Sequence, residues 1–243
     1  MKKITSALYT NQGKRTVNED TVHYFTCEDT QSGEQIHVAL VSDGLGGHGD
    51  GEVASKLAVE TVEKCFILYP EFSEDNIYQI IQAAHQNILA LHSEERNCKA
   101  TIVAAFIKND EVIVAHSGDS RFYSFGRFGI THRTRDHSVS QMAVDMGVIT
   151  HDDIPHSPDR NRVLHCLGGT EFKADVQTLK KQKHKGILLC TDGFWENVSE
   201  KEMLASLRKS KNADKWLEKM IQVLQEKEDE KQDNYSAIVI LNK

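Results

Sequence analysis

Acidic residues recur at the ends of the segments that we expect to form β-strands. The ends of neighbouring strands can converge on one rim of a sheet, where several carboxylates repel one another unless cations neutralise them. Oxygen ligands select hard ions such as Mg²⁺ or Mn²⁺. Taken singly, each aspartate is also typical of a turn or a helix cap. The joint placement favours a divalent-cation site, and the residues concerned are Glu19, Asp20, Asp43, Asp119, Asp192 and Asp233.

One of these carboxylates stands at the mouth of a glycine-rich loop. The stretch 38–55 reads VALVSDGLGGHGDGEVAS, in which Gly44, Gly46 and Gly49 fit the dinucleotide pattern G-x-G-x-x-G. That interpretation is weak, because Asp43 beside the first glycine would repel a pyrophosphate and no clear parallel βαβ unit follows. A P-loop is excluded, because no Gly-Lys-Ser/Thr follows the loop.

The elements that must position these residues can be read from hydrophobic patterning. Runs rich in β-branched and aromatic residues, separated by turn residues, predict strands. These runs are 4–9, 21–27, 36–42, 100–107, 112–117, 121–125, 186–190 and 235–241. Asn109-Asp110 is typical of a hairpin turn between two of them.

Apolar residues at helical spacing predict two helices in the first half of the chain, over 54–65 and 77–91. Two charged helices are expected over 201–209 and 214–228. The stretch 142–162 shows little periodicity, so we expect a mobile surface segment there. The order of strands and helices does not alternate, which indicates an α+β fold with antiparallel sheets flanked by helices.

Length and composition set outer limits on the function. The chain has 243 residues, 39% of them hydrophobic, which suits one globular domain over 1–243. A net charge of −7 argues against a nucleic-acid partner, and no apolar run is long enough to span a membrane. The five cysteines lack metal-ligand spacing and are expected to be reduced thiols. We therefore expect a cytoplasmic protein.

Seven motifs then appear in the order of a known family. They are GKRTVNED (13–20), VSDGLGGHGDGEVAS (41–55), HSGDSRFY (116–123), TRDHS (134–138), RNRVLHCLGG (160–169), LLCTDGFWE (188–196) and DNYSAIVI (233–240). On these motifs the chain resembles the metal-dependent protein serine/threonine phosphatases of the protein phosphatase 2C (PPM) family, compact bacterial type. The resemblance implies an αββα sandwich of two antiparallel β-sheets flanked by helices.

The resemblance also implies roles for individual residues. Asp43 is expected to bridge two Mn²⁺ or Mg²⁺ ions, with the Gly44 carbonyl on the second ion and Asp192 and Asp233 on the first. Glu19 and Asp20 would hold metal-bound waters or the second ion, and Asp119 would join Asp192 in a weaker third site. Arg15 is expected to grip the substrate phosphate, and 142–162 matches the flap beside the active site.

The implied reaction is hydrolysis of phosphoserine and phosphothreonine in proteins. Two ions make a shared water a nucleophile near neutral pH, which then attacks phosphorus directly. The partners would be phosphoproteins made by a cognate kinase, and the chain is expected to be a monomer. A small phosphorylated metabolite as substrate, or a pseudophosphatase that only senses or docks, stays open as an alternative.

Histidine roles are less defined in the sequence. His48 lies in the glycine loop and is interpreted either as the acid that protonates the leaving group or as a residue that braces the loop. His116, His132 and His151 show no metal-ligand spacing, so we expect them to be structural or exposed.

Overall fold

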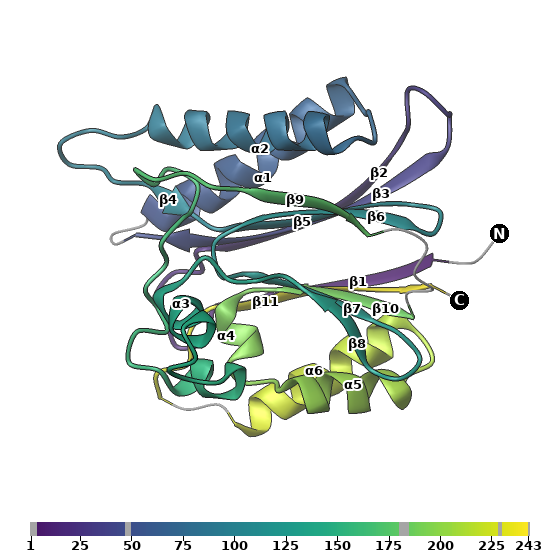
Figure 1. Cartoon of the computed structure of the whole chain (residues 1–243), viewed down its shortest axis with the longest axis vertical. Coiled ribbons are helices and arrows are strands. Elements are labelled where there is room, and N and C mark those ends of the chain that lie inside the picture. Colours follow the sequence, from purple (N-terminus) through teal and green to yellow (C-terminus); the bar gives the residue numbers. More distant parts are fainter. Residues whose placement is uncertain (1–3, 47–49, 180–184, 228–229, 243) are drawn as a thin grey trace.

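The computed structural model describes residues 4–46, 50–179, 185–227 and 230–242 (Figure 1). Its strands in chain order are β1 (Ile4–Asn11), β2 (Asp20–Glu28), β3 (Gln35–Leu45), β4 (Lys99–Ala100), β5 (Ile102–Lys108), β6 (Glu111–Ser117), β7 (Arg121–Phe125), β8 (Ile130–Arg133), β9 (Asp175–Leu179), β10 (Gly186–Cys190) and β11 (Tyr235–Asn242). Its helices are α1 (Asp50–Leu68), α2 (Glu74–Leu89), α3 (Val139–Asp145), the 3₁₀ helix η1 (His151–His156), α4 (Asp192–Trp195), α5 (Glu200–Arg208) and α6 (Ala213–Glu226).

The strands form two antiparallel sheets that lie face to face. One sheet has the order β1-β11-β10-β7-β8, and the other has the order β2-β3-β5-β6-β9, with β4 pairing β3. Helices α1 and α2 cover the outer face of the second sheet, whereas α5 and α6 cover the outer face of the first (Figure 1). The expected αββα sandwich is confirmed.

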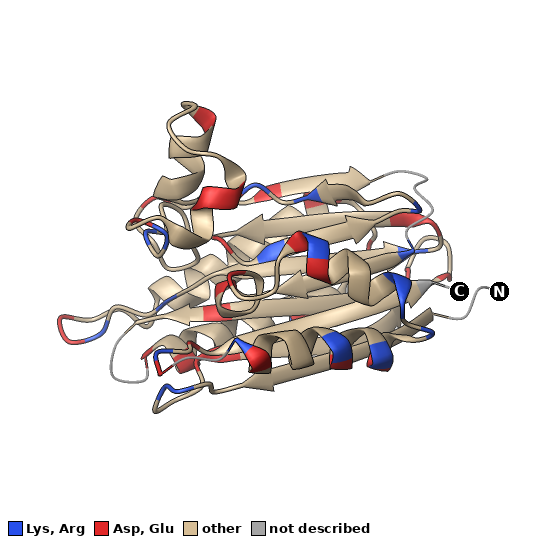
Figure 2. Ribbon diagram, turned by 90° about the horizontal axis from the view of Figure 1, so that it is seen from below, with Lys and Arg blue, Asp and Glu red and all other residues tan. Residues whose placement is uncertain are grey.

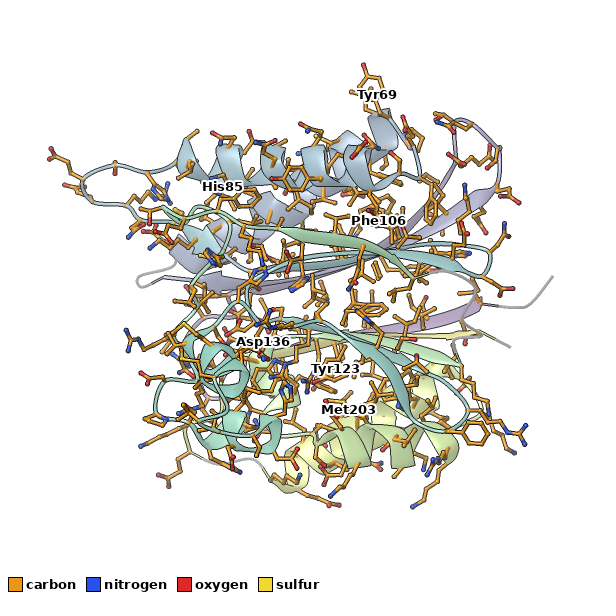
Figure 3. The ribbon with its side chains drawn as sticks, viewed as in Figure 1. Tyr69, His85, Phe106, Tyr123, Asp136 and Met203 are labelled. Atoms are coloured by element: carbon orange, nitrogen blue, oxygen red, sulfur yellow. The ribbon has the colours of Figure 1, made fainter. Side chains whose placement is uncertain are left out.

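Three layers of apolar side chains hold the four structural layers together. One layer packs α1 and α2 onto their sheet and includes Phe106, whose ring makes a tilted contact with that of Phe66 (Figure 3). A second packs α5 and α6 onto the other sheet around Tyr123 and Met203, and a third fills the space between the sheets. Such burial is the main favourable term in folding, and it fixes how the sheet ends meet.

Local sequence signals account for most helix boundaries. Ser73 caps α2 by accepting a hydrogen bond from the Asn76 amide, and Asn212 caps α6 in the same way. Ser199 and Glu202 form a reciprocal capping box at the start of α5. The apolar stripe predicted over 54–65 is the buried face of α1.

The predicted elements agree with the structure with some corrections. The run 100–107 is not one strand, because β4 and β5 are interrupted at Thr101, whose amide donates to the Asp43 carbonyl. Strands β8 and β9 were not predicted. The stretch 142–162, expected to be a mobile surface segment, contains the end of α3 and the helix η1, and its mobility stays a prediction. Asn109 does form the β5–β6 turn, with a φ of 56°.

Other sequence expectations also have structural counterparts. The five cysteines are free, with Cys98, Cys166 and Cys190 buried and the other two half-buried. Figure 2 shows acidic and basic residues interspersed along the ribbon. Among the described helices, none is both long and apolar enough to cross a lipid bilayer.

Candidate active site

The six-stranded sheet brings the first group of carboxylates together. Asp20 opens β2 and lies directly opposite Asp43, near the end of the antiparallel neighbour β3. Glu19 precedes Asp20, and its carbonyl accepts a hydrogen bond of 3.1 Å from the Gly44 amide. The hairpin register therefore holds two carboxylates side by side at one end of this sheet.

The five-stranded sheet supplies two more carboxylates at the same end of the sandwich. Asp192 follows β10 and Asp233 precedes β11, and these two strands are antiparallel neighbours. Each side chain accepts a hydrogen bond from the next backbone amide, at 2.6 Å from Gly193 and 2.8 Å from Asn234. These short turns fix the direction of both carboxylates.

A buried hydroxyl joins the two sheets at this point. Thr191 Oγ1 donates to Asp20 Oδ2 at 3.0 Å and accepts from the Ser236 amide at 3.0 Å. Because Asp20 belongs to one sheet and Ser236 to the other, this contact sets how the two pairs of carboxylates face each other.

Asp119 lies in the connection between β6 and β7, where the chain crosses from one sheet to the other. Its side chain is buried, with the residue 2% exposed, and its carbonyl accepts a 3.0 Å hydrogen bond from the Trp195 indole. Next to it, Ser120 Oγ lies 2.7 Å from Thr101 Oγ1, which in turn accepts from the Asp43 amide at 3.0 Å. This chain of contacts ties Asp119 to Asp43.

Gly44 lies where β3 meets the start of α1. A Cβ atom at Gly44 would collide with the carbonyl oxygen of Gly51, so only glycine permits this approach. The Glu19 carboxylate accepts hydrogen bonds from the backbone at Gly51 and Glu52, in the first turn of α1. Gly44 itself belongs to strand β3 and pairs with Ala100, so what it permits is the close approach to α1. His48 and Gly49 lie outside the described residues.

Burial and mutual repulsion dominate the electrostatics of the carboxylate cluster. Burial, followed by repulsion from Asp192, raises the pKa of both Asp43 and Asp119 well above the ordinary value. Burial and the neighbouring Asp233 raise the pKa of Asp192, and burial raises the pKa of Asp20 to about 7. Protein alone therefore does not stabilise these carboxylates in their charged form.

The donor set fits a hard divalent cation. Asp20 Oδ1 is buried and has no hydrogen-bond partner among the described residues, so this oxygen is available as a ligand. Carboxylate and carbonyl oxygens are the ligands that Mg²⁺ and Mn²⁺ prefer. Bound cations would neutralise the repulsion that raises these pKa values.

Arg15 reaches the cluster from the segment between β1 and β2. Its Nη2 donates to Asp233 Oδ2 at 2.5 Å, and its side chain is 56% exposed. The guanidinium keeps further donors directed at solvent, which a phosphate oxygen can use. Arg15 therefore lies beside the carboxylate cluster, whereas the candidate His48 lies outside the described residues.

The chain was then compared with known proteins. A family model described as Protein phosphatase 2C matches residues 9–235, which is nearly the whole chain. The chain belongs to the protein phosphatase 2C family. The family expected from the seven motifs is therefore confirmed.

Relatives of this protein phosphatase 2C chain include curated bacterial proteins. The serine/threonine phosphatase stp of Listeria monocytogenes is 32% identical over 205 residues, which cover 80% of this chain and 79% of that protein. The serine/threonine protein phosphatase PstP of Mycobacterium tuberculosis is 27% identical over 200 residues, which cover 80% of this chain and 37% of that protein.

Solved structures share the same fold. The serine/threonine phosphatase of S. agalactiae superimposes with a TM-score of 0.85 at 21% identity, over 99% of this chain and 100% of that one. The catalytic domain of PstP, solved in complex with two manganese ions, gives a TM-score of 0.82 at 22% identity, over 100% of this chain and 99% of that one.

One acidic residue of this protein phosphatase 2C site was not found in the sequence. Glu196 lies four residues after Asp192 at the end of α4, and burial followed by repulsion from Asp192 raises its pKa to about 7. Its Oε1 lies 3.4 Å from Arg160 Nε. The i,i+4 spacing of two carboxylates in 188–196 was the available signal, because helical residues at that spacing share a face.

Proposed function

We propose that this chain hydrolyses phosphoserine and phosphothreonine in proteins with the help of Mn²⁺ or Mg²⁺. The observation that carries this proposal is the buried carboxylate cluster, in which Asp20, Asp43, Asp119 and Asp192 all have raised pKa values. Family membership and the activity named for the relatives support it.

The cluster offers ligands for two ions and for a weaker third. Asp43 would be a ligand shared by the first and second ions, and Asp192 and Asp233 would hold the first. The Gly44 carbonyl would hold the second ion, Glu19 and Asp20 would hold metal-bound waters or the second ion, and Asp119 with Asp192 would hold the third. Such ions would supply Lewis acidity and would lower the pKa of water, which would make it a nucleophile toward phosphorus at neutral pH.

Arg15 has a separate role in the proposal. A planar guanidinium binds two phosphoryl oxygens at once, which orients the phosphate and offsets its charge. The contact of 2.5 Å with Asp233 holds Arg15 beside the cluster before substrate arrives. Because more than half of the side chain is exposed, a phosphate on the surface of another protein can reach it.

The hydrogen bonds around the cluster keep it in place. Thr191 and the amides of Gly193 and Asn234 donate hydrogen bonds to three of the carboxylates, those of Asp20, Asp192 and Asp233, and so hold their orientations. Enzymes gain most from groups that are already oriented when the reaction begins. These contacts therefore serve the reaction without taking part in bond making.

We further infer that the substrates are the products of a cognate serine/threonine kinase, and that 1–243 acts as one monomeric catalytic domain. A cytoplasmic location is supported by the five free cysteines, because such thiols persist in reducing compartments.

The test measures hydrolysis of a phosphothreonine peptide and of an aryl phosphate. We expect turnover of both with Mn²⁺, none with a chelator, and a loss of at least about 100-fold in Asp192→Asn. Asp29→Asn is the matched control, because Asp29 is also buried but pairs with Lys108 outside the cluster. Equal turnover by wild type in Mn²⁺ and in chelator would refute the proposal.

Two other outcomes identify the alternatives. Turnover of the aryl phosphate without turnover of any phosphopeptide indicates a small phosphorylated metabolite as substrate. Binding of Mn²⁺ without hydrolysis of either compound indicates a pseudophosphatase.

A further inference from the structure

A second cluster of metal-ligating side chains lies outside the carboxylate cluster. His116, at the end of β6, His137, just before α3, and Asp175, the first residue of β9, each offer one ligand atom, and these atoms all lie within 4.8 Å of one another. The sequence analysis expected His116 to be structural or exposed. It is 3% exposed, and its ring stacks on that of His137 with centroids 4.7 Å apart.

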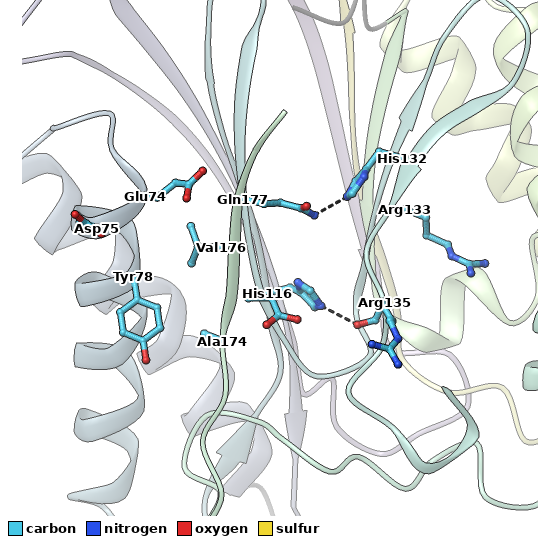
Figure 4. A pocket seen from close by; sticks show the side chains of 11 residues that line it. Glu74, Asp75, Tyr78, His116, His132, Arg133, Arg135, Ala174, Val176 and Gln177 are labelled. Atoms are coloured by element: carbon cyan, nitrogen blue, oxygen red, sulfur yellow. Dashed lines mark hydrogen bonds between the residues drawn. The ribbon is translucent and has the colours of Figure 1, made fainter. Parts of the chain in front are cut away.

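The orientation of His116 is that of a metal ligand. Its Nε2 lies 2.9 Å from the Arg135 carbonyl, which only accepts, so Nε2 carries the proton (Figure 4). Nδ1 is then left with a lone pair. Histidines that bind metals usually donate their other ring N–H to a carbonyl or carboxylate, which fixes both the tautomer and the ring.

His137 and Asp175 already form a close pair. His137 Nε2 lies 3.0 Å from Asp175 Oδ2, and His137 is 6% exposed. A cation between these atoms replaces this hydrogen bond, and the ring proton moves to Nδ1. Because Nδ1–H and the Gly118 amide, which lie 3.4 Å apart, would then both be donors, the ring would also turn slightly away from Gly118.

Both histidines are in the form that binds metal. Burial lowers the pKa of His116, and burial and the neighbouring His116 lower that of His137 to about 4. Metal ligands must be deprotonated, so neither ring has to release a second proton at neutral pH.

The cluster is open to solvent on two sides. A cavity of 640 Å³ is lined by His116 and Asp175, and a second of 180 Å³ is lined by His137 and Asp175. Asp175 borders both, and its side chain is 44% exposed. Figure 4 shows the larger cavity with His116 at its wall. An ion therefore has a path to the site.

We propose that His116, His137 and Asp175 form a zinc site that is separate from the carboxylate cluster. Two imidazoles and one carboxylate suit Zn²⁺, whereas Mg²⁺ and Mn²⁺ prefer oxygen ligands alone. Tetrahedral zinc bonds of about 2.0–2.2 Å place the ligand atoms about 3.4 Å apart. The 3.0 Å His137–Asp175 pair would therefore open slightly, and the third ligand atom, which lies within 4.8 Å, would move to that spacing. Water completes the four ligands.

The site joins three parts of the chain that support the candidate active site. The His137 amide donates to the Gly118 carbonyl at 2.9 Å, beside Asp119, and Ser138 is the N-cap of α3. Zinc would fix the start of α3 to β6 and β9. Its role in this proposal is structural.

The test uses the full chain in saturating Mg²⁺, so that the carboxylate cluster is occupied, with Zn²⁺ added alone as the probe. Calorimetry is expected to show one Zn²⁺ per chain. At a hundred times Kd, zinc should raise Tm by about 5–10 °C. Co²⁺ in place of zinc should show ligand-field bands of imidazole coordination.

The variants assign the site. His116→Gln keeps a donor for the Arg135 carbonyl but lacks Nδ1, and Asp175→Asn removes the charge from a half-exposed residue that tolerates the change. Both should weaken zinc binding by at least about ten-fold. Lys173→Gln should strengthen it, because Lys173 Nζ lies 3.1 Å from Asp175 Oδ1 and competes for the carboxylate.

His23→Asn is the matched control, because His23 and Glu63 form another histidine–carboxylate contact, of 2.8 Å, and its loss should leave zinc binding unchanged. The proposal is overturned if wild type binds no zinc above Mg²⁺. It is equally overturned if His116→Gln and Asp175→Asn bind zinc as wild type does. Neither result depends on phosphatase activity.

Discussion

Asp20→Asn should change stability in opposite directions with and without divalent cations. In the protein alone, burial and repulsion from Asp192 raise the pKa of Asp20 from 3.8 to about 7. The folded state then binds more protons than the unfolded state between these values, so stability falls as pH rises from about 4 to about 7. Asparagine has no charge to bury and escapes this loss.

The magnitude follows from the two pKa values. A rise from 3.8 to about 7 corresponds to about 4 kcal/mol above pH 7. The substitution also weakens the hydrogen bond from Thr191, which offsets about 1 kcal/mol of this gain in stability. We expect a net gain of about 1–3 kcal/mol at pH 8, which is about 3–10 °C in Tm for a chain of this size. The gain should shrink toward pH 4 and vanish below about pH 3, where Asp20 is protonated in both states.

Divalent cations should make wild type more stable than Asp20→Asn. A ligand lost from the site weakens metal binding by about 10–100-fold, or about 1.4–2.7 kcal/mol, so wild type gains more from Mn²⁺ than the variant does. The assay is thermal unfolding of both proteins at pH 4.5 and pH 8, in chelator and in Mn²⁺.

Asp29→Asn is the control with the opposite expectation. Burial raises the pKa of Asp29, but hydrogen bonds from Lys108 and Ser32 lower this pKa to about 2. The variant should lose about 1–3 kcal/mol in chelator and in Mn²⁺ alike. If Asp20→Asn at pH 8 lost as much stability in chelator as in Mn²⁺, the reasoning on the cluster would be refuted.

Two further predictions concern packing around the site. Gly44→Ala should lower Tm by several degrees and weaken Mn²⁺ binding, because the added Cβ meets the Gly51 carbonyl. Gly129→Ala should do neither, because Gly129 has open space around it. Equal Tm values for the two variants would contradict this prediction. Asp136→Asn should lower the free energy of unfolding in urea by about 3–5 kcal/mol, because it removes the carboxylate that lies 2.7 Å from the buried Arg121 guanidinium. Asp159→Asn, at the exposed partner of Arg162, should change the same quantity by no more than about 1 kcal/mol. A similar small cost at both positions would contradict this prediction.

Much of the fold could be predicted because its core elements carry strong patterns. Strand β5 is a continuous apolar run, and α1 has a regular apolar stripe. Strands β8 and β9 are short and half-buried, so their partners rather than their composition make them strands. Helix α4 begins with Asp192-Gly193, a typical turn pair, and only packing of Phe194 and Trp195 into the core favours a helix there.

The candidate site, like the fold, could be predicted only in part from the sequence. Its six predicted carboxylates could be located because each one stands at the end of a recognisable strand, which Glu196 does not. The His116 cluster could not, because Asp175 opens β9, a strand that was not predicted, and 38 positions separate it from His137. Ligands from separate segments can be predicted only when each one stands at a recognisable strand end.

The carboxylate cluster also connects the two extremes of the chain. Arg15 and Asp233 touch although 218 positions separate them, and Asp20 contacts Thr191 across 171. A cation that is bound by residues from both ends of the chain would act as a reversible cross-link that closes a very long loop. A permanent cross-link over a loop of that length would contribute about 5 kcal/mol to stability. If a protease cut the backbone between them, a bound ion would add to the pairing of β1 with β11 that holds the two pieces together, and that contribution would be lost once the ion was withdrawn.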